Sequence, residues 1–427
     1  MKIPSHTAAW VALSLALGPR SKRFSALYAH FGSPEAILAA DNAEIRALLP
    51  DIGDGALAAL CYEKHADEVA RIISYCRRTG VCILVPDGDD YPGSLLSIAE
   101  PPVVLYCRGK LPRMGQHPFI GMVGTRSLDA YGERAAYKIS FELAAAGAVI
   151  VSGMADGIDG VCHAATLDAD GLTVAVLGSG IDHVYPRHHT RLFSEIAEFG
   201  AVVTEYAPGT LPHQCNFPAR NRIISALSEA VVVVEGDERS GALITARYAL
   251  LQGKSLFAVP GNIDSLQSEG SNLLLRAGAR VALCAEDILT HFRFLYREHI
   301  GLLLPDEAMQ FSAVSDEKLR AHGVRPVTQR RKEKPGRRAG KLFEQPVGDD
   351  AHVGEKHSTE AALAEAVASL AARERAIYAL LPDTPFTVDY LVAAGIPAGE
   401  AVAAMTLFEI LGLVSARPGG TYQKSVA

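Results

Sequence analysis

The sequence predicts an α/β fold: a doubly wound, mainly parallel sheet with a helical N-terminal domain and a winged-helix-like C-terminal domain. Short runs rich in Val and Ile alternate with helix-length segments between about residues 80 and 290. These runs lack the apolar–polar alternation of half-exposed strands, so we expect strands that are buried on both faces of a parallel sheet. Helical periodicity replaces this rhythm before residue 78 and after residue 362.

Composition narrows the class of protein. A chain of 427 residues is long for one domain, and its 49% hydrophobic content suits a large core. The net charge of −7 excludes a generally basic DNA-binding protein, so any nucleic-acid contact must come from a local patch. The seven cysteines show no metal-ligand spacing, and the apolar run at 8–17 is too short to cross a bilayer. We therefore expect a soluble cytoplasmic protein without metal, cofactor or membrane contact.

The N-terminal domain, residues 1–78, is helical in pattern. Ser33 is a typical helix cap, and Glu35 follows it at the start of an apolar period. The stretch "LLPDIGDGALAAL" (48–60) predicts two helices joined by a tight turn. It is either a plain glycine turn in a small bundle or a helix-hairpin-helix-like (SAM-like) module that holds DNA backbone.

The core, residues 79–298, contains six apolar runs that predict strands: 119–123, 148–153, 173–178, 201–206, 230–236 and 255–260. Nearly every run is followed by Gly or Ser ahead of a helix. Ligands of open parallel sheets bind beyond the carboxyl ends of the strands, where helix N-termini and glycine backbones favour anions. With Arg126, Arg220 and Arg222 on the same edge, these loops predict a site for an extended anion such as a row of phosphates.

The stretch "FPARNRIISALS" (217–228) sets Arg220, Asn221 and Arg222 at the start of an apolar helix. Arginine forks and free helix N–H groups suit phosphate, whereas the alternative is an ordinary surface helix with solvated arginines. Asp159 and His163, four residues apart, are either an acid–base couple or a helix-start acid beside a packed histidine. No GxGxxG follows the first run and no GxxxxGK[ST] occurs, which argues against NAD and against a P-loop ATPase.

Residues 299–361 predict a disordered linker. Its run 325–341 carries eight positive residues against Glu333 alone, and is either a loose electrostatic contact for nucleic acid or a solvated spacer. Residues 362–427 suggest three helices and a hairpin, as in a winged helix. The expected third helix, 398–414, has two glutamates and no Lys or Arg, so we expect it to meet protein and not duplex DNA.

Seven separated motifs resemble the DNA-processing protein A family, also called DprA or Smf. They are "MVGTR", "VSGMADGID", "AVLGSGIDHVYP", "FPARNRIIS", "VVVVEG", "SGALITARYALLQGK" and "FAVPGN". The upstream "DDYPGSLLSIAEPPVVLYCRG" also fits, with Glu100 where the family usually has Asp. The resemblance covers roughly residues 85–290, and the flanking domains match the family only in kind.

The resemblance implies a non-enzymatic protein that binds single-stranded DNA and loads the RecA recombinase onto it, as in natural transformation of competent bacteria. It also implies an extended Rossmann-like sheet that pairs as a homodimer. The arginines should grip phosphates while an aromatic ring stacks on a base. The resemblance and the strand-end loops together give the predicted DNA-binding residues: Gly124, Thr125, Arg126, Ser152, Gly153, Gly157, Asp159, Gly178, Gly180, Phe217, Arg220, Asn221, Arg222, Ser240, Gly241 and Thr245.

Two features set alternatives against this interpretation. Residues 115–290 contain 12 Lys/Arg and 19 Asp/Glu, so the positive potential must be confined to the pocket, and dimerisation or the linker must help to hold DNA.

Rossmann-like nucleotide phosphoribohydrolases share a glycine-rich edge, but their PGGxGTxxE motif needs a catalytic Glu. Here Gly241 matches the motif, yet no Glu occurs between Ala242 and Gln252. A pure protein scaffold acting through the winged helix would leave the strand-end loops unexplained.

Overall fold

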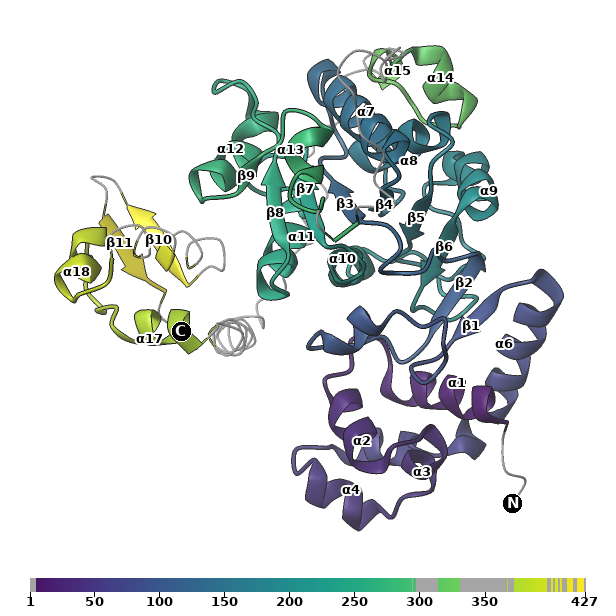
Figure 1. Cartoon of the computed structure of the whole chain (residues 1–427). Coiled ribbons are helices and arrows are strands. Elements are labelled where there is room, and N and C mark those ends of the chain that lie inside the picture. Colours follow the sequence, from purple (N-terminus) through teal and green to yellow (C-terminus); the bar gives the residue numbers. More distant parts are fainter. Residues whose placement is uncertain are drawn as a thin grey trace, which may run out of the picture. The chain divides into compact units, whose positions relative to one another are not determined.

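The computed structural model describes residues 5–293, 295–296, 314–330, 367, 372–397, 401, 404–405, 408, 413–417 and 421–425. Two compact units are present (Figure 1). The first is Met1–Asn272 with Val281–Thr328, and the second is Leu273–Arg280 with Gln329–Ala427. No described helix is long and apolar enough to cross a membrane.

The first unit begins with a helical bundle. Its helices are α1 (His6–Leu17), α2 (Arg23–Phe31), α3 (Pro34–Ala39), α4 (Asn42–Leu48), α5 (Asp54–Ala59), η1 (Tyr62–Lys64) and α6 (Ala66–Thr79). Trp10 is fully buried at its centre, with its ring 6.0 Å from that of Phe24 and 5.4 Å from that of Tyr28. The Trp10 indole N–H also donates to Asp87 at 3.0 Å, which fastens the bundle to the segment leading into the sheet.

Nine strands form one sheet in the order β1-β2-β6-β5-β4-β3-β7-β8-β9. The strands β6, β5, β4, β3, β7 and β8 are parallel, and β1 and β2 join antiparallel beside β6. All six predicted runs contain a strand: β3 (Phe119–Val123), β4 (Val149–Ser152), β5 (Thr173–Val176), β6 (Ala201–Thr204), β7 (Ala230–Val233) and β8 (Ser255–Ala258). None of the predicted runs corresponds to β1 (Cys82–Leu84), β2 (Leu105–Gly109) or β9 (Arg280–Val281).

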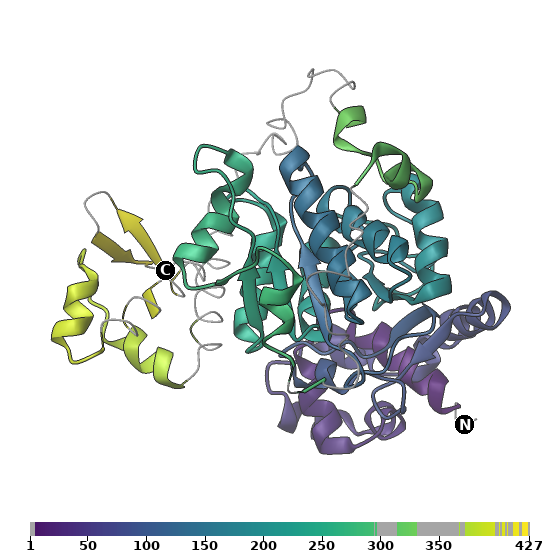
Figure 2. The same cartoon turned by 45° about the horizontal axis from the view of Figure 1, so that its top comes forward.

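Helices cover both faces of the sheet, which confirms the doubly wound fold. On one face lie α7 (Ala130–Ala145), α8 (Ile158–Asp168) and α9 (Thr190–Phe199). On the other lie α10 (Asn216–Leu227) and α11 (Gly241–Leu251) (Figures 1 and 2). The order of the strands reverses between β3 and β7, and this switch point is where open α/β sheets bind ligands. The remaining short helices between β1 and residue 290 are η2 (Gly93–Ser97), η3 (Arg187–His189), η4 (Leu266–Ser268), α12 (Glu269–Arg276) and α13 (Ala285–Leu289).

The expectation of an unstructured linker over 299–361 is wrong for residues 314–328. Here α14 (Asp316–Ala321) and the first residues of α15 (Val327–Arg330) belong to the first unit. Leu319, Val324 and Val327 are buried, and the Val327 N–H donates to Glu133 at 2.8 Å. The rest of the basic run 325–341, beyond Arg330, lies outside the described residues.

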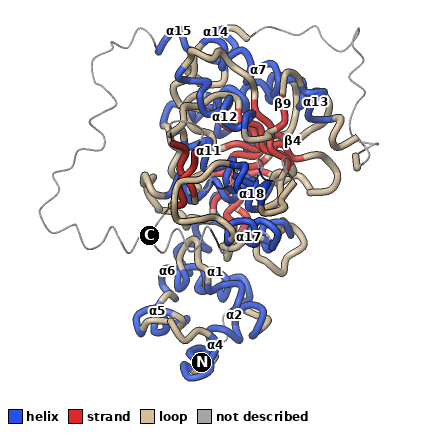
Figure 3. The backbone as a smooth tube through the Cα atoms, turned by 90° about the vertical axis from the view of Figure 1, so that its left-hand side faces the viewer, coloured by secondary structure: helices blue, strands red, loops and turns tan. Residues whose placement is uncertain are grey.

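The second unit carries a winged-helix-like domain. Its described elements include the helices α17 (Ala372–Ala379) and α18 (Val388–Ala393) (Figures 1 and 3). An antiparallel hairpin of β10 (Val414–Arg417) and β11 (Thr421–Lys424) follows (Figure 1). Most of the predicted helix 398–414 lies outside the described residues, but Met405 and Phe408 within it are buried. The Phe408 ring packs edge-on against Tyr378, with the ring centroids 5.3 Å apart. Met405 and Phe408 therefore belong to the core of this domain.

Candidate nucleic-acid interface

Backbone contacts join three strand-end loops at the switch point. The Thr125 N–H, just after β3, donates to the Glu235 carbonyl after β7 at 2.7 Å. The Ile158 N–H, at the start of α8, donates to the Thr125 carbonyl at 3.2 Å. Gly157 has a φ of +90°, and a Cβ there would overlap Thr125 O. A Cβ at Gly124 would overlap Ile158, so both glycines are required for the close approach of these loops.

A stack of one cation and two aromatic rings lies on this edge. The Arg126 guanidinium is 5.0 Å from the centroid of the Phe217 ring, and Arg126 is exposed. The Tyr185 ring lies 5.4 Å from that of Phe217 and is tilted by 36°, with 44% of Tyr185 exposed. Gly178 makes room for Phe217, because a Cβ there would come within 2.9 Å of the ring. Arginine and aromatic faces in one place are typical of single-stranded nucleic-acid binding.

Sequence reasoning missed Tyr185. It belongs to the quoted motif "AVLGSGIDHVYP", but its only local signal is an aromatic residue ahead of a proline. Its proximity to Phe217 arises because the loops after β5 and β6 meet at one edge of the sheet.

Arg220 is buried and holds a loop. Its guanidinium donates to the carbonyl of Gly153 at 2.7 Å and to the carbonyl of Val176. Burial lowers the pKa of Arg220 to about 10, although the nearby Asp159 charge opposes this shift. The Asp159 carboxylate accepts the Gly153 N–H at 3.2 Å, and burial raises its pKa against the pull of Arg220 and Arg126. A side chain at Gly153 would overlap the Arg220 guanidinium, so these groups together fix the loop after β4.

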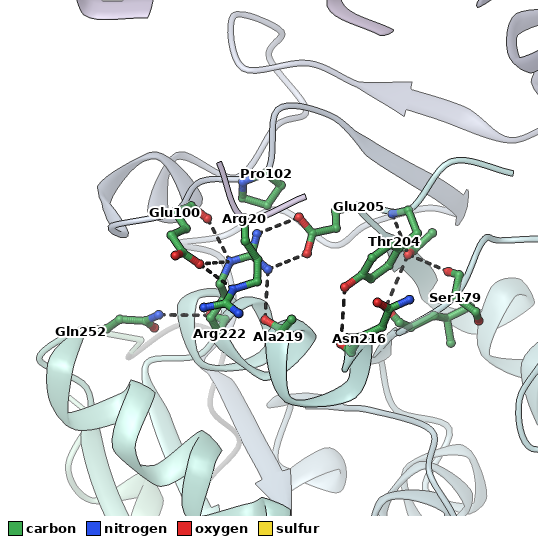
Figure 4. Close-up of polar contacts among 12 residues, drawn as sticks. Arg20, Glu100, Pro102, Ser179, Thr204, Glu205, Asn216, Ala219, Arg222 and Gln252 are labelled. Atoms are coloured by element: carbon green, nitrogen blue, oxygen red, sulfur yellow. Dashed lines mark hydrogen bonds and ion pairs between the residues drawn. The ribbon is translucent and has the colours of Figure 1, made fainter. Parts of the chain in front are cut away.

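Arg222 is also buried, in a second polar cluster that Figure 4 shows. It forms a bidentate ion pair with Glu205, in which its two terminal guanidinium nitrogens lie 2.5 Å and 2.7 Å from the two carboxylate oxygens. Its Nε donates to the Glu100 carbonyl at 2.9 Å. The Glu100 carboxylate in turn accepts from Arg20 of the helical bundle at 2.7 Å. The helix α10 starts at Asn216, one turn before the predicted start, so Arg220 and Arg222 lie inside it. Both guanidiniums therefore face protein acceptors and not the surface.

The remaining predicted residues divide by exposure. Asn221 joins α10 to α11 by donating to the Gly241 carbonyl at 3.2 Å, and Ser240 caps α11 by accepting the Ala242 N–H at 3.3 Å. Ser152 donates to the Met122 carbonyl at 2.6 Å inside the sheet. Six of the sixteen reach the surface at least in part: Gly124, Arg126, Phe217, Asn221, Ser240 and Gly241. Ten are buried: Thr125, Ser152, Gly153, Gly157, Asp159, Gly178, Gly180, Arg220, Arg222 and Thr245.

Burial and hydrogen bonds explain the shifted pKa values of two side chains near this edge of the sheet, His163 and Glu235. His163 is fully buried and donates through Nδ1 to Thr173 Oγ1 at 2.7 Å, and burial lowers its pKa to about 3. This favours the packed histidine over an acid–base couple with Asp159. Glu235 accepts the Asp129 N–H at 3.2 Å at the start of α7, and burial, aided by the Asp129 charge, raises its pKa to about 7.

Comparisons with known proteins agree with this architecture. The family model for DNA recombination-mediator protein A matches residues 82–293, and the model for the DprA winged helix domain matches residues 361–420. The DNA processing protein DprA of Bacillus subtilis is 41% identical over 226 residues, which cover 53% of this chain and 76% of that protein. Protein Smf of Synechocystis sp. is 36% identical over 345 residues, covering 80% and 79%. The structure of DNA processing protein A from Streptococcus pneumoniae aligns with a TM-score of 0.60 and 30% identity, over 68% of this chain and 98% of that one.

Proposed function

The chain belongs to the DNA-processing protein A family, also called DprA or Smf, and on this premise we propose that it binds single-stranded DNA at the carboxyl edge of its sheet and delivers the strand to the RecA recombinase. The observation that carries the DNA-binding part is the stack of Arg126, Phe217 and Tyr185 beside the switch point. Bases stack on aromatic rings without regard to sequence, and an arginine adds phosphate affinity.

The predicted residues have two roles in this function: some contact the DNA, and others hold the loops in shape. The partly exposed residues, with Tyr185 added, meet the strand. The buried ones shape the loops, and Arg220 and Arg222 act as positioning residues because their donors bind protein carbonyls and Glu205. Delivery to RecA and assembly as a homodimer rest on the family resemblance, and a cytoplasmic location rests on the composition of the chain. We assign no catalytic step, since the helix after β7 carries no carboxylate between Ala242 and Gln252, where a phosphoribohydrolase needs its catalytic Glu.

A competition titration tests the DNA-binding part. Fluorescence anisotropy with a labelled single strand is followed as unlabelled single strands and duplexes of matched sequence are added at several salt concentrations. Single strands should compete better than duplex and nearly independently of sequence, because the stack offers ring faces and no set of side chains to read base edges. Equal or better competition by duplex would refute the proposal.

The RecA part has its own test. RecA ATPase activity is measured on single strands already coated with a single-strand-binding protein, with and without this chain. The chain should shorten the lag before ATP hydrolysis. An unchanged lag at concentrations that saturate the strand would reject delivery to RecA while leaving the DNA-binding proposal intact.

A further inference from the structure

One group of side chains beside the candidate interface has the composition of a metal site. Asp156 lies in the loop between β4 and α8, and His188 and His189 end η3 ahead of α9. Each offers a ligand atom, and the three atoms lie within 4.8 Å of one another. Asp156 Oδ1 and His188 Nε2 are 2.9 Å apart. Among the described residues, no other group of His, Cys, Asp and Glu meets this criterion.

The fold holds His189 in a fixed orientation. His189 is fully buried, and its Nδ1 donates to the Met154 carbonyl at 3.0 Å. Because a carbonyl oxygen can only accept, the proton of the neutral ring is on Nδ1 and the lone pair is on Nε2. Metal-bound histidines typically donate their other N–H to a carbonyl or carboxylate in this way.

The backbone around His189 is specialised for this packing. Met154 has a φ of +54°, which is uncommon for a residue other than glycine and costs free energy. A Cβ at Gly160 would come within 2.9 Å of His189 Cε1, so a glycine there lets the imidazole lie against α8.

From this arrangement we propose that Asp156, His188 and His189 bind a divalent transition-metal ion of the zinc class. Two imidazole nitrogens and one carboxylate oxygen suit Zn²⁺ or Co²⁺, with bonds of about 2.0–2.2 Å. Tetrahedral bonds of that length put donor atoms about 3.4 Å apart, so the Asp156–His188 separation has to open only slightly. Three protein ligands leave a position for water or another oxygen.

The site lies on the same loops as the proposed DNA-binding edge. Asp156 precedes Gly157, and His188 follows Tyr185 by three residues. Asp156 and His188 are both partly exposed, so the open position can face solvent. If the proposed function holds, a phosphate oxygen of the strand could fill that position. Binding of the ion itself does not depend on DNA, so the two proposals can fail separately.

Cobalt spectroscopy tests the metal site. The full chain is treated with a chelator, freed of it and titrated with Co²⁺. We expect visible d–d absorption that saturates at one equivalent, is displaced by Zn²⁺ and lacks a thiolate-to-cobalt charge-transfer band. The double variant Asp156→Asn/His188→Gln should lose this absorption. Circular dichroism should show that the variant stays folded, since neither side chain is buried.

A matched control addresses a competing pair. His213 Nδ1 and Cys215 Sγ lie 3.0 Å apart on an exposed loop and could bind a soft metal by chance. The variant Cys215→Ser should keep the full Co²⁺ absorption. The site is refuted if no d–d absorption develops, if it survives in Asp156→Asn/His188→Gln, or if Cys215→Ser removes it.

Discussion

Three arginines that look alike in the sequence have different surroundings in the structure. Arg126 is exposed against Phe217, whereas Arg220 and Arg222 are buried. The sequence predicts their shared edge because all three follow parallel strands. It could not predict the burial of Arg220 and Arg222, because their hydrogen-bond acceptors lie in other segments of the chain. These acceptors are Gly153 for Arg220, and Glu205 and Glu100 for Arg222.

The exposed arginine should act on DNA alone. Arg126→Ala should weaken single-strand binding by about 1–3 kcal/mol, the scale of a charge-assisted contact, and make the salt dependence of affinity shallower. Anisotropy titrations at several salt concentrations measure both effects. The matched control is Arg78→Ala, an exposed arginine on α6, which should bind normally. Normal binding by Arg126→Ala would remove Arg126 from the site.

Replacing the buried Arg222 should lower the stability of the protein before it affects DNA binding directly. Arg222→Ala leaves the Glu205 carboxylate buried without its two-pronged partner, and loss of one member of a buried pair costs about 3–5 kcal/mol. Urea unfolding should show this loss in the free energy of unfolding of the first unit. A variant with wild-type stability that nevertheless fails to bind DNA would show that Arg222 contacts the strand directly.

Tyr185 should contribute through its ring. Tyr185→Ala should weaken single-strand binding by about 1–3 kcal/mol, the usual loss for one stacked base. Tyr185→Phe keeps the ring and should bind almost normally, which separates stacking from a role of the hydroxyl group. The same titration measures both variants, and equal losses in the two would argue against stacking.

Among the elements, the strands buried on both faces of the sheet are the most predictable. Each of the six apolar runs contains a strand because burial on both faces demands continuous Val and Ile. The strands β1 and β9 have only three and two residues, too few to show a period. The segment 314–328 was missed for a different reason. It is polar overall, and the few apolar residues that enter the core, such as Leu319, Val324 and Val327, show no helical or strand period.

Polar contacts fasten that segment to the core. His322 contacts Glu195 through Nδ1 at 2.6 Å and Asp168 through Nε2 at 3.1 Å. The Tyr137 hydroxyl donates to the other oxygen of Asp168 at 2.5 Å. Such anchors depend on partners over a hundred residues away, which no local pattern reveals.

This anchor should make stability depend on pH. The hydrogen bond to Asp168, followed by the contacts with Glu195, raises the pKa of His322 above its usual value. A raised pKa in the folded state stabilises the protein below the unfolded pKa of about 6.5, and the stabilisation is lost as pH rises through the folded pKa. The melting-temperature difference between wild type and His322→Gln should therefore be largest below about pH 6.5 and shrink at higher pH. A difference that grows with pH would contradict the assigned contacts.

For the whole molecule, charge is the main constraint on DNA binding. The net charge of −7 repels a polyanion, and Arg126 is the one exposed member of the three predicted arginines. Ring stacking at the switch point does not depend on net charge, so it can supply preference for single strands. Long-range attraction needs another source, and residues 331–341 hold six positive charges against Glu333.

Two deletions separate these contributions. Removing residues 331–341 should lower single-strand affinity at low salt but not at high salt, because added ions screen the attraction between its basic side chains and the phosphates, and the preference over duplex should remain. Removing residues 325–341 also takes away Val327, whose side chain is buried and whose N–H donates to Glu133. That longer deletion should therefore lower the melting temperature as well. Anisotropy at two salt concentrations and thermal unfolding measure the two effects. Complete loss of binding on removal of 331–341 alone would move the primary DNA site from the edge of the sheet to the basic run.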